Sequence, residues 1–175
     1  RRVRIPKAAC ILYSGFAILN DFTSQTIIMH LTQQTDYALR VLIYTAINNE
    51  GLVNIAEIAK TYDISKSHLM KVVTALVKGG FLHSVRGKGG GLRLGKEPEQ
   101  IRVGDVVRLT EPMVIAECFG ENNECIISPH CRLANILNSG LKLFLTHLDN
   151  YTLADLLNSG TQKILYRIDM SIQPE

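Results

Sequence analysis

The sequence has no tryptophan, only 6% aromatic residues and no run of about 18 consecutive apolar residues, so the bulk of the chain is not embedded in lipid. It also shows no recognisable catalytic set of Ser, His and an acidic residue and no pair of carboxylates for acid-base chemistry, which argues against an enzyme. The glycine-rich run 87–91 has no GK[ST] ending, which argues against a phosphate-binding loop. The 46% apolar and 20% charged residues exclude disorder as the main state and predict one globular domain or two small ones.

The formal net charge of +3 hides an uneven distribution of charge along the chain. Residues 1–28 carry +3, so the remainder sums to zero. Within that remainder, residues 54–102 hold nine Lys or Arg against four Asp or Glu, whereas residues 103–175 hold five against nine. A basic module of about 50 residues beside an acidic one predicts a polyanionic partner for the basic part.

Residues 1–28 differ in pattern from the rest of the chain. They are basic from Arg1 to Lys7 and apolar from Ala8 to Leu19, which resembles a signal peptide. No small-x-small cleavage pattern follows Leu19, however. We therefore interpret them as a leader or upstream extension outside the fold, with Met29 as the start of the folded part.

Three helices are expected in the first half of the folded part. Apolar residues at helical spacing predict a helix over residues 32–48. Asn54 followed three positions later by Glu57 predicts the capped start of a short second helix. Ser65 then predicts the cap of a third helix, which has one apolar stripe and ends at a glycine pair.

A β-hairpin is expected to follow the third helix. Residues 81–85 and 92–94 are short strand-like runs, and the cationic, glycine-rich segment 86–91 between them predicts a long flexible tip. Two helices joined by a short turn and followed by a basic hairpin have the order of a winged helix-turn-helix. The predicted fold class is therefore mainly α with a small β-hairpin wing.

The candidate nucleic-acid contacts come from the start of the third helix and from the hairpin tip. If the apolar stripe faces the core, short polar and cationic side chains face outward, where a recognition helix meets base edges and phosphates. Glycines at the tip allow close backbone approach to phosphates or a minor groove. A solvated basic helix and an ordinary turn explain either piece alone as well, whereas their ordered combination favours DNA binding over that interpretation. The candidates are Ser65, Lys66, Ser67, His68, Lys71, Arg86 and Lys88.

The second half of the chain alternates helices with a long loop. A helix is expected over residues 103–111, followed by a loop over 112–131 with Gly, Asn and Pro. A long amphipathic helix follows over 133–148, and a capping-box pattern at 152–155 predicts a last short helix. After Asn158 the sequence has no clear helix or strand signal.

Three of the four cysteines, Cys118, Cys125 and Cys131, lie in the loop, whereas Cys10 lies in the leader. A disulfide framework expects pairs and an oxidising compartment. Zinc sites usually show C-x2-C spacing, which is absent, although His130 could complete a Cys3His set. Three thiolates with one labile coordination position suit an iron-sulfur cluster. The spacing leaves a cluster, a zinc site and unligated redox thiols all open.

Three segments resemble one known family, the iron-sulfur winged-helix transcriptional repressors, and in particular its nitric-oxide-sensing members. The segments are residues 29–40 (MHLTQQTDYALR), 85–94 (VRGKGGGLRL) and 149–156 (DNYTLADL). The resemblance covers residues 29–158, nearly the whole folded part. It implies a winged helix-turn-helix with a long C-terminal dimerisation helix.

The resemblance also implies a function and a ligand set. It implies a cytoplasmic homodimer that represses transcription at palindromic double-stranded operator DNA, until nitric oxide attacks its 4Fe-4S or 2Fe-2S cluster. The implied cluster ligands are Cys118, Cys125, Cys131 and, from the partner subunit, Asp36. From the residues alone, Asp36 is only a first-turn carboxylate that the helix dipole favours.

The sequence departs from the family pattern at two places. The His that follows the last cysteine by three positions in cluster-biogenesis regulators is Ala134 here, and the spacing from Cys118 to Cys125 is longer than usual. The alternatives are a regulator of iron or cluster supply and a zinc or thiol redox-sensing winged-helix regulator. The expected organisation is a leader over 1–28, a DNA-binding domain over 29–102, a cluster-binding loop with dimerisation helices over 103–160 and a tail over 161–175.

Overall fold

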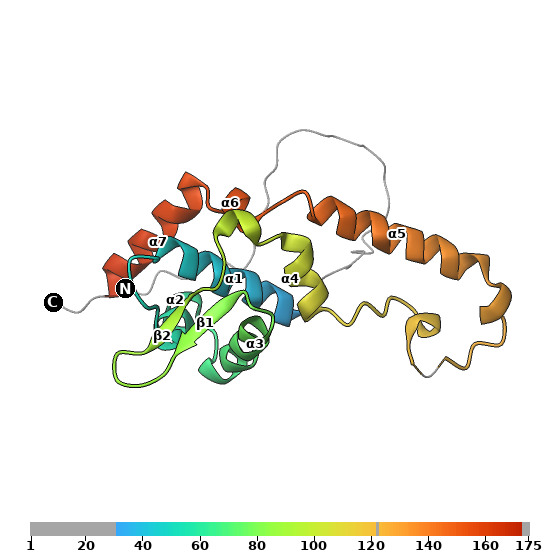
Figure 1. Cartoon of the computed structure of the whole chain (residues 1–175), viewed down its shortest axis with the longest axis horizontal. Helices are drawn as coiled ribbons and strands as arrows, with labels where there is room; N and C mark the ends of the chain where they lie inside the picture. The colour runs from blue at the N-terminus through green and yellow to red at the C-terminus, as the bar shows by residue number, and fades with distance from the viewer. Residues whose placement is uncertain (1–30, 122, 173–175) are drawn as a thin grey trace, which may run out of the picture. The chain divides into compact units, whose positions relative to one another are not determined.

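The computed structural model describes residues 31–121 and 123–172 (Figure 1), so the leader over 1–28, including Cys10, and Met29 lie outside the described part. No described helix is long and apolar enough to cross a membrane. The α-helices and strands, in chain order, are α1 (Gln33–Ile47), α2 (Ile55–Tyr62), α3 (Lys66–Lys78), β1 (Leu82–Val85), β2 (Gly91–Leu94), α4 (Val103–Thr110), α5 (Arg132–Leu148), α6 (Leu153–Leu156) and α7 (Ser159–Ile172). This order confirms the predicted fold class, mainly helical with one antiparallel hairpin.

Helix α1 lies at the centre of the described part, where it contacts α3, α4, β2 and α6. Its Ala38, Val41 and Leu42 are completely buried. They recur at the three- and four-residue spacing that places side chains on one helix face, so the helix predicted over 32–48 is confirmed. We call α1 to α4, together with the hairpin, the winged-helix module (residues 33–110).

The starts of α2 and α3 are held by the caps that the sequence predicts. The Asn54 side chain accepts a hydrogen bond from the Ala56 N–H at 2.9 Å, and Glu57 accepts from the Asn54 N–H at 3.3 Å. Asp63, in the left-handed conformation with φ 53°, makes the turn between the two helices. Ser65 Oγ then accepts from the His68 N–H at 3.3 Å. These bonds satisfy backbone donors that a helix leaves unpaired at its start.

The hairpin is antiparallel, with Leu82 opposite Leu94 and Val85 opposite Gly91. Leu82 and Leu92 are buried, so one face of the hairpin packs on the core. At the tip, Gly87 has φ 107° and Gly89 has φ 81°, a backbone region that side chains other than glycine rarely adopt. The glycines of the tip are therefore required by its backbone conformation.

The helices predicted after the hairpin are also present. Helix α4 buries Val103, Val106 and Val107 against the module, and its main contacts are with α1, α3 and α5. Helix α6 begins with the predicted capping box, in which Asp155 accepts from the Thr152 N–H at 2.7 Å. These hydrogen bonds from Thr152 hold the pKa of Asp155 below its ordinary range.

Helix α7 is an element that the sequence analysis did not find, because it assigned residues 161–175 to a tail. The Asn158 side chain accepts from the Thr161 N–H at 2.9 Å and starts the helix. Leu165 is buried in the core, and α7 contacts α2. A local pattern does not reveal this helix, because its burial depends on a surface about 100 residues earlier in the chain.

Asn54→Ala should lower the free energy of unfolding by about 1 kcal/mol, because it removes the side chain that caps α2. Chemical denaturation monitored by far-ultraviolet circular dichroism measures the change. Asn49→Ala is the matched control, since Asn49 is exposed in the turn after α1 and caps no helix. Equal stability of the two variants would contradict the assigned cap.

Candidate nucleic-acid interface and cysteine loop

The N-terminal part of α3 presents a polar face to solvent, as the sequence predicts. Leu69, Val72 and Leu76 are buried on the opposite side of the helix. Ser65 Oγ lies 3.2 Å from Ser67 Oγ while it caps the helix. The five candidate residues on this face, all exposed, are Ser65, Lys66, Ser67, His68 and Lys71.

The cations of this surface are not neutralised by neighbouring carboxylates. Lys66, Lys71, Arg86 and Lys88 are exposed, and none of them belongs to an ion pair within the described residues. Salt bridges in that part instead involve Arg40 and Arg108. Unpaired cations on one helix end and one hairpin tip suit contact with a phosphate backbone.

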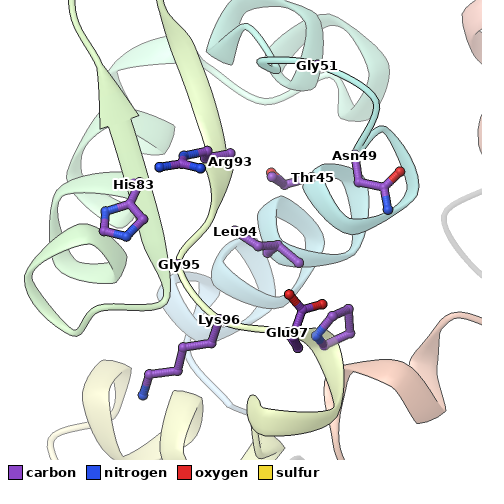
Figure 2. Close-up of a pocket in the computed structure, with 10 residues that line it drawn as sticks. Thr45, Asn49, Gly51, His83, Arg93, Leu94, Gly95, Lys96 and Glu97 are labelled. Carbon is purple, nitrogen blue, oxygen red and sulfur yellow. The ribbon is translucent and has the colours of Figure 1, made fainter.

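Two further basic residues of the hairpin were missed by the sequence analysis. His83 and Arg93 are directly opposite each other in register and exposed. Figure 2 shows their side chains beside a hollow of about 440 Å³ between α1 and the base of the hairpin, which Lys96 and Glu97 also line. The two-residue alternation of strands is the signal that finds them, because their neighbours Leu82 and Leu92 face inward.

The cysteine loop, residues 111–131, joins α4 to α5 and carries three free thiols. Cys118 lies in the short 3-10 turn Glu117–Phe119, and Cys131 lies directly before α5. The Cys125 N–H donates to Asn123 Oδ1 at 3.1 Å. All three cysteines are half-buried. Across residues 31–121 and 123–165, no three Cys, His, Asp or Glu side chains gather into a group able to hold a metal, so His130 does not complete one either.

The start of the loop is tied to the start of α1 through Glu111. One carboxylate oxygen of Glu111 accepts hydrogen bonds from the Thr32 N–H at 2.8 Å, from the Thr32 hydroxyl at 3.1 Å and from the buried Thr35 hydroxyl. The Thr35 and Thr110 hydroxyls lie 2.6 Å apart. The loop therefore leaves the winged-helix module at the first turn of α1.

Asp36 lies on that same first turn and is exposed. It forms a two-pronged ion pair with Arg40 one turn later, at 2.8 Å and 3.0 Å. Arg40 also lies over the ring of Tyr62, 5.6 Å from its centroid. Within the described residues the carboxylate of Asp36 is therefore engaged with a cation of its own helix.

Helix α5 carries apolar side chains that the single chain leaves in solvent. None of its residues is buried, and Leu133, Ile136 and Leu143 expose 59%, 63% and 69% of their surface. Around Gly140, where an added Cβ would meet nothing within 4 Å, Ile136 and Leu143 line a shallow, open hollow on the surface of the helix. In Figure 1, α5 extends away from the helices around α1.

Comparisons with known proteins agree with a winged-helix module followed by a cysteine loop and a long helix. The sequence profile of the Rrf2 family, described as an iron-dependent transcriptional regulator, matches residues 31–159. The chain is 52% identical over 132 residues to the HTH-type transcriptional regulator NsrR of Bacillus licheniformis, over 74% of this chain and 92% of the relative. It is 52% identical over 134 residues to NsrR of Bacillus subtilis strain 168, over 75% of this chain and 92% of the relative.

A solved structure shares the fold. It is that of CymR, the global cysteine regulator of B. subtilis, which is 28% identical and has a TM-score of 0.56. The similarity covers 74% of this chain and 97% of CymR.

Arg86→Ala or Lys88→Ala should weaken binding to duplexes of any sequence, and each should reduce the slope of log affinity against log salt by about 0.9 if it contacts one phosphate. Ser67→Ala or His68→Ala should instead reduce discrimination, by about 1 to 3 kcal/mol for each base contact that the substitution removes. Fluorescence anisotropy with a duplex selected from a random pool and with a scrambled duplex separates the two effects.

Lys142→Ala, an exposed cation on α5, is the control for overall charge. If all four variants on α3 and the hairpin bind both duplexes as the parent does, this surface does not contact nucleic acid.

Proposed function

This chain belongs to the Rrf2 family of iron-dependent transcriptional regulators, and on that basis we propose that it is a nitric-oxide-sensitive repressor. Its membership makes it a DNA-binding regulator of transcription with a winged helix, and not an enzyme. In the proposal, a cytoplasmic homodimer with an iron-sulfur cluster binds palindromic operator DNA and releases it when nitric oxide reacts with the cluster. The observation that carries the proposal is three free thiols on one loop between the winged-helix module and an uncovered apolar helix.

The DNA-binding part of the proposal is supported by the exposed face of α3. Its first turn presents Ser67 and His68 beside unpaired lysines, and the hairpin tip adds Arg86. Such side chains donate to or accept from base edges, and cations position the protein on phosphates. A dimer with two-fold symmetry presents this face twice, so the operator it reads is a palindrome.

The homodimer is supported by the exposed apolar surface of α5. A helix of 17 residues that buries none of them within one chain has apolar surface available for a partner. A second copy of α5 fits this surface, because the hollow at Gly140 lets two helix backbones approach closely beside Ile136 and Leu143. Burial of each such side chain contributes about 1.5 to 3 kcal/mol.

The cysteine loop is suited to hold an iron-sulfur cluster by the chemistry of its donors. Thiolates are the usual cluster ligands, and Cys118, Cys125 and Cys131 are free, half-buried and close in sequence. Cys131 also lies at the start of α5, where the helix dipole favours a negatively charged group. In the described part of one chain the three thiols do not gather into a metal-binding group, so cluster binding requires the loop to bring them together. Three thiolates are one ligand fewer than the usual four-thiolate set, so a further ligand is needed. The cluster, when bound, supplies iron with which nitric oxide reacts.

Asp36 of the partner subunit is the proposed fourth ligand, on the strength of the resemblance in residues 29–40. A carboxylate oxygen binds iron more weakly than a thiolate does, so this position is the most exchangeable. To ligate, Asp36 must give up its ion pair with Arg40. The free-energy cost of breaking this pair is small, because an exposed ion pair at this helical spacing contributes about 0.3 to 0.5 kcal/mol to stability.

Cys118→Ala, Cys125→Ala and Cys131→Ala should each abolish the visible absorbance and the bound sulfide of anaerobically purified protein, because each removes a cluster ligand. Iron and sulfide analysis with visible spectroscopy measures the loss. Cys10→Ala is the control and should retain the chromophore. Stoichiometric zinc without sulfide in the parent protein would favour the zinc alternative, and protein without any metal would favour a thiol redox sensor.

Ile136→Glu or Leu143→Glu should convert the homodimer into a monomer at micromolar concentration, because each places a charge on the exposed apolar face of α5. Sedimentation equilibrium measures the mass, and circular dichroism confirms that the chain remains folded. Asn138→Glu is the matched control, since Asn138 is exposed on the same helix but does not line the hollow. A parent chain that sediments as a monomer contradicts the homodimer.

A further inference from the structure

An ion pair with two parallel hydrogen bonds joins α4 to the C-terminal end of α5. Arg108 Nη1 donates to Asp149 Oδ1 at 2.7 Å, and Nη2 donates to Oδ2 at 2.6 Å. Arg108 also donates to Asp105 Oδ1 at 3.1 Å. The hydrogen bonds from Arg108 hold the pKa of Asp149 below its ordinary range, and Asp149 in turn raises the pKa of Arg108. A planar guanidinium that meets a carboxylate in this way fixes direction as well as distance.

The path of the chain makes the junction of α4 with the C-terminal end of α5, which we call the corner, important for the direction of α5. The chain leaves α4 at Glu111, passes through the cysteine loop and α5, and returns to α4 at Asp149. Helix α5 buries no residue, and α4 is its main neighbour. The Val103 N–H then donates to the Tyr151 carbonyl at 2.9 Å, which fixes the chain just after the ion pair. The C-terminal end of α5 is thus the part anchored to the winged-helix module.

The placement of Asp149 is not explained by helix capping. Asp149 occupies the C-cap position of α5, where the helix dipole disfavours the negative charge of its side chain. A Cβ on Gly104 would lie 2.0 Å from Asp149 Oδ1, so a glycine at this position of α4 leaves room for the carboxylate. Arg108 and Asp149 are partly exposed, at 38% and 27%, so their pairing contributes little to stability. Its main physical effect is on geometry.

We propose that Arg108 and Asp149, with Gly104 beneath them, are positioning residues that set the direction of α5 relative to the winged-helix module. In the homodimer they thereby set the distance between the two half-sites that the protein reads. This inference rests on the proposed function, because it requires two copies joined through α5. A rotation of the winged-helix module relative to α5 at this corner moves α3 of one subunit relative to α3 of the other. The distance between the two α3 helices in turn sets the spacing of the half-sites.

The test compares variants of the two carboxylates that Arg108 contacts. Asp149→Asn removes the charge of the two-pronged pair, and Arg108→Lys keeps the charge but loses the planar fork. Asp105→Asn is the matched control, because it removes the other partner of the same arginine. The probes are the palindromic duplex that the parent chain selects from a random pool, the same duplex with its spacer one base pair longer or shorter, and a duplex with one half-site.

Asp149→Asn and Arg108→Lys should lower the preference for the selected spacing by about tenfold. Both should bind the single half-site as the parent does and have an almost unchanged melting temperature. Asp105→Asn should keep the parental preference.

If the parent chain does select a palindromic duplex, two results would overturn the inference alone. Either both variants keep the parental spacing preference, or half-site and palindrome binding weaken equally, which would indicate a role in folding alone. If the parent chain selects no palindromic duplex, the proposed function fails and the spacing role fails with it. If the parent selects one and the variants read it unchanged, only the role of the ion pair fails.

Discussion

The burial of one face of α1 is the constraint on which the rest of the structure depends. Ala38, Val41 and Leu42 have no exposed surface, and α3, α4, β2 and α6 all contact this helix. Interiors are packed as densely as organic crystals, so the elements around α1 cannot shift independently. The direction of the polar face of α3 and the place where α4 ends therefore both follow from the position of α1. The first turn of α1 also receives the beginning of the cysteine loop, because Glu111 accepts hydrogen bonds from Thr32 and Thr35. This short connection joins the loop that carries the thiols to the helix on which α3 packs.

The apolar side chains of helix α5 are left uncovered by the described part of a single chain. Its C-terminal end is anchored by the pair of Arg108 and Asp149, whereas Ile136 and Leu143 remain exposed. The winged-helix module buries its core within one chain, whereas the apolar face of α5 stays exposed. In the proposed homodimer, this division combines a DNA-reading face that is fixed within each chain with a half-site distance that the pair of Arg108 and Asp149 sets.

Elements with local causes could be predicted from the sequence. The helix over 33–47, the caps at Asn54 and Ser65 and the glycine-rich tip follow from side chains within a few residues of one another. The exposed candidates on α3 were predictable for the same reason, since the period of a helix assigns each residue to a face. Even the clustering of three cysteines in one loop is a property of the sequence alone.

Features that join distant residues emerged only in the folded chain. Arg108 pairs with Asp149, 41 positions later in the chain, and Leu165 of α7 is buried in the core. The residues around each of them in the sequence indicate neither the ion pair nor the burial. The hydrogen bond between Glu111 and Thr35 likewise depends on which side chains reach each other in space. Local patterns contain no information on such pairs, because the free energy that selects them arises from packing of the whole chain.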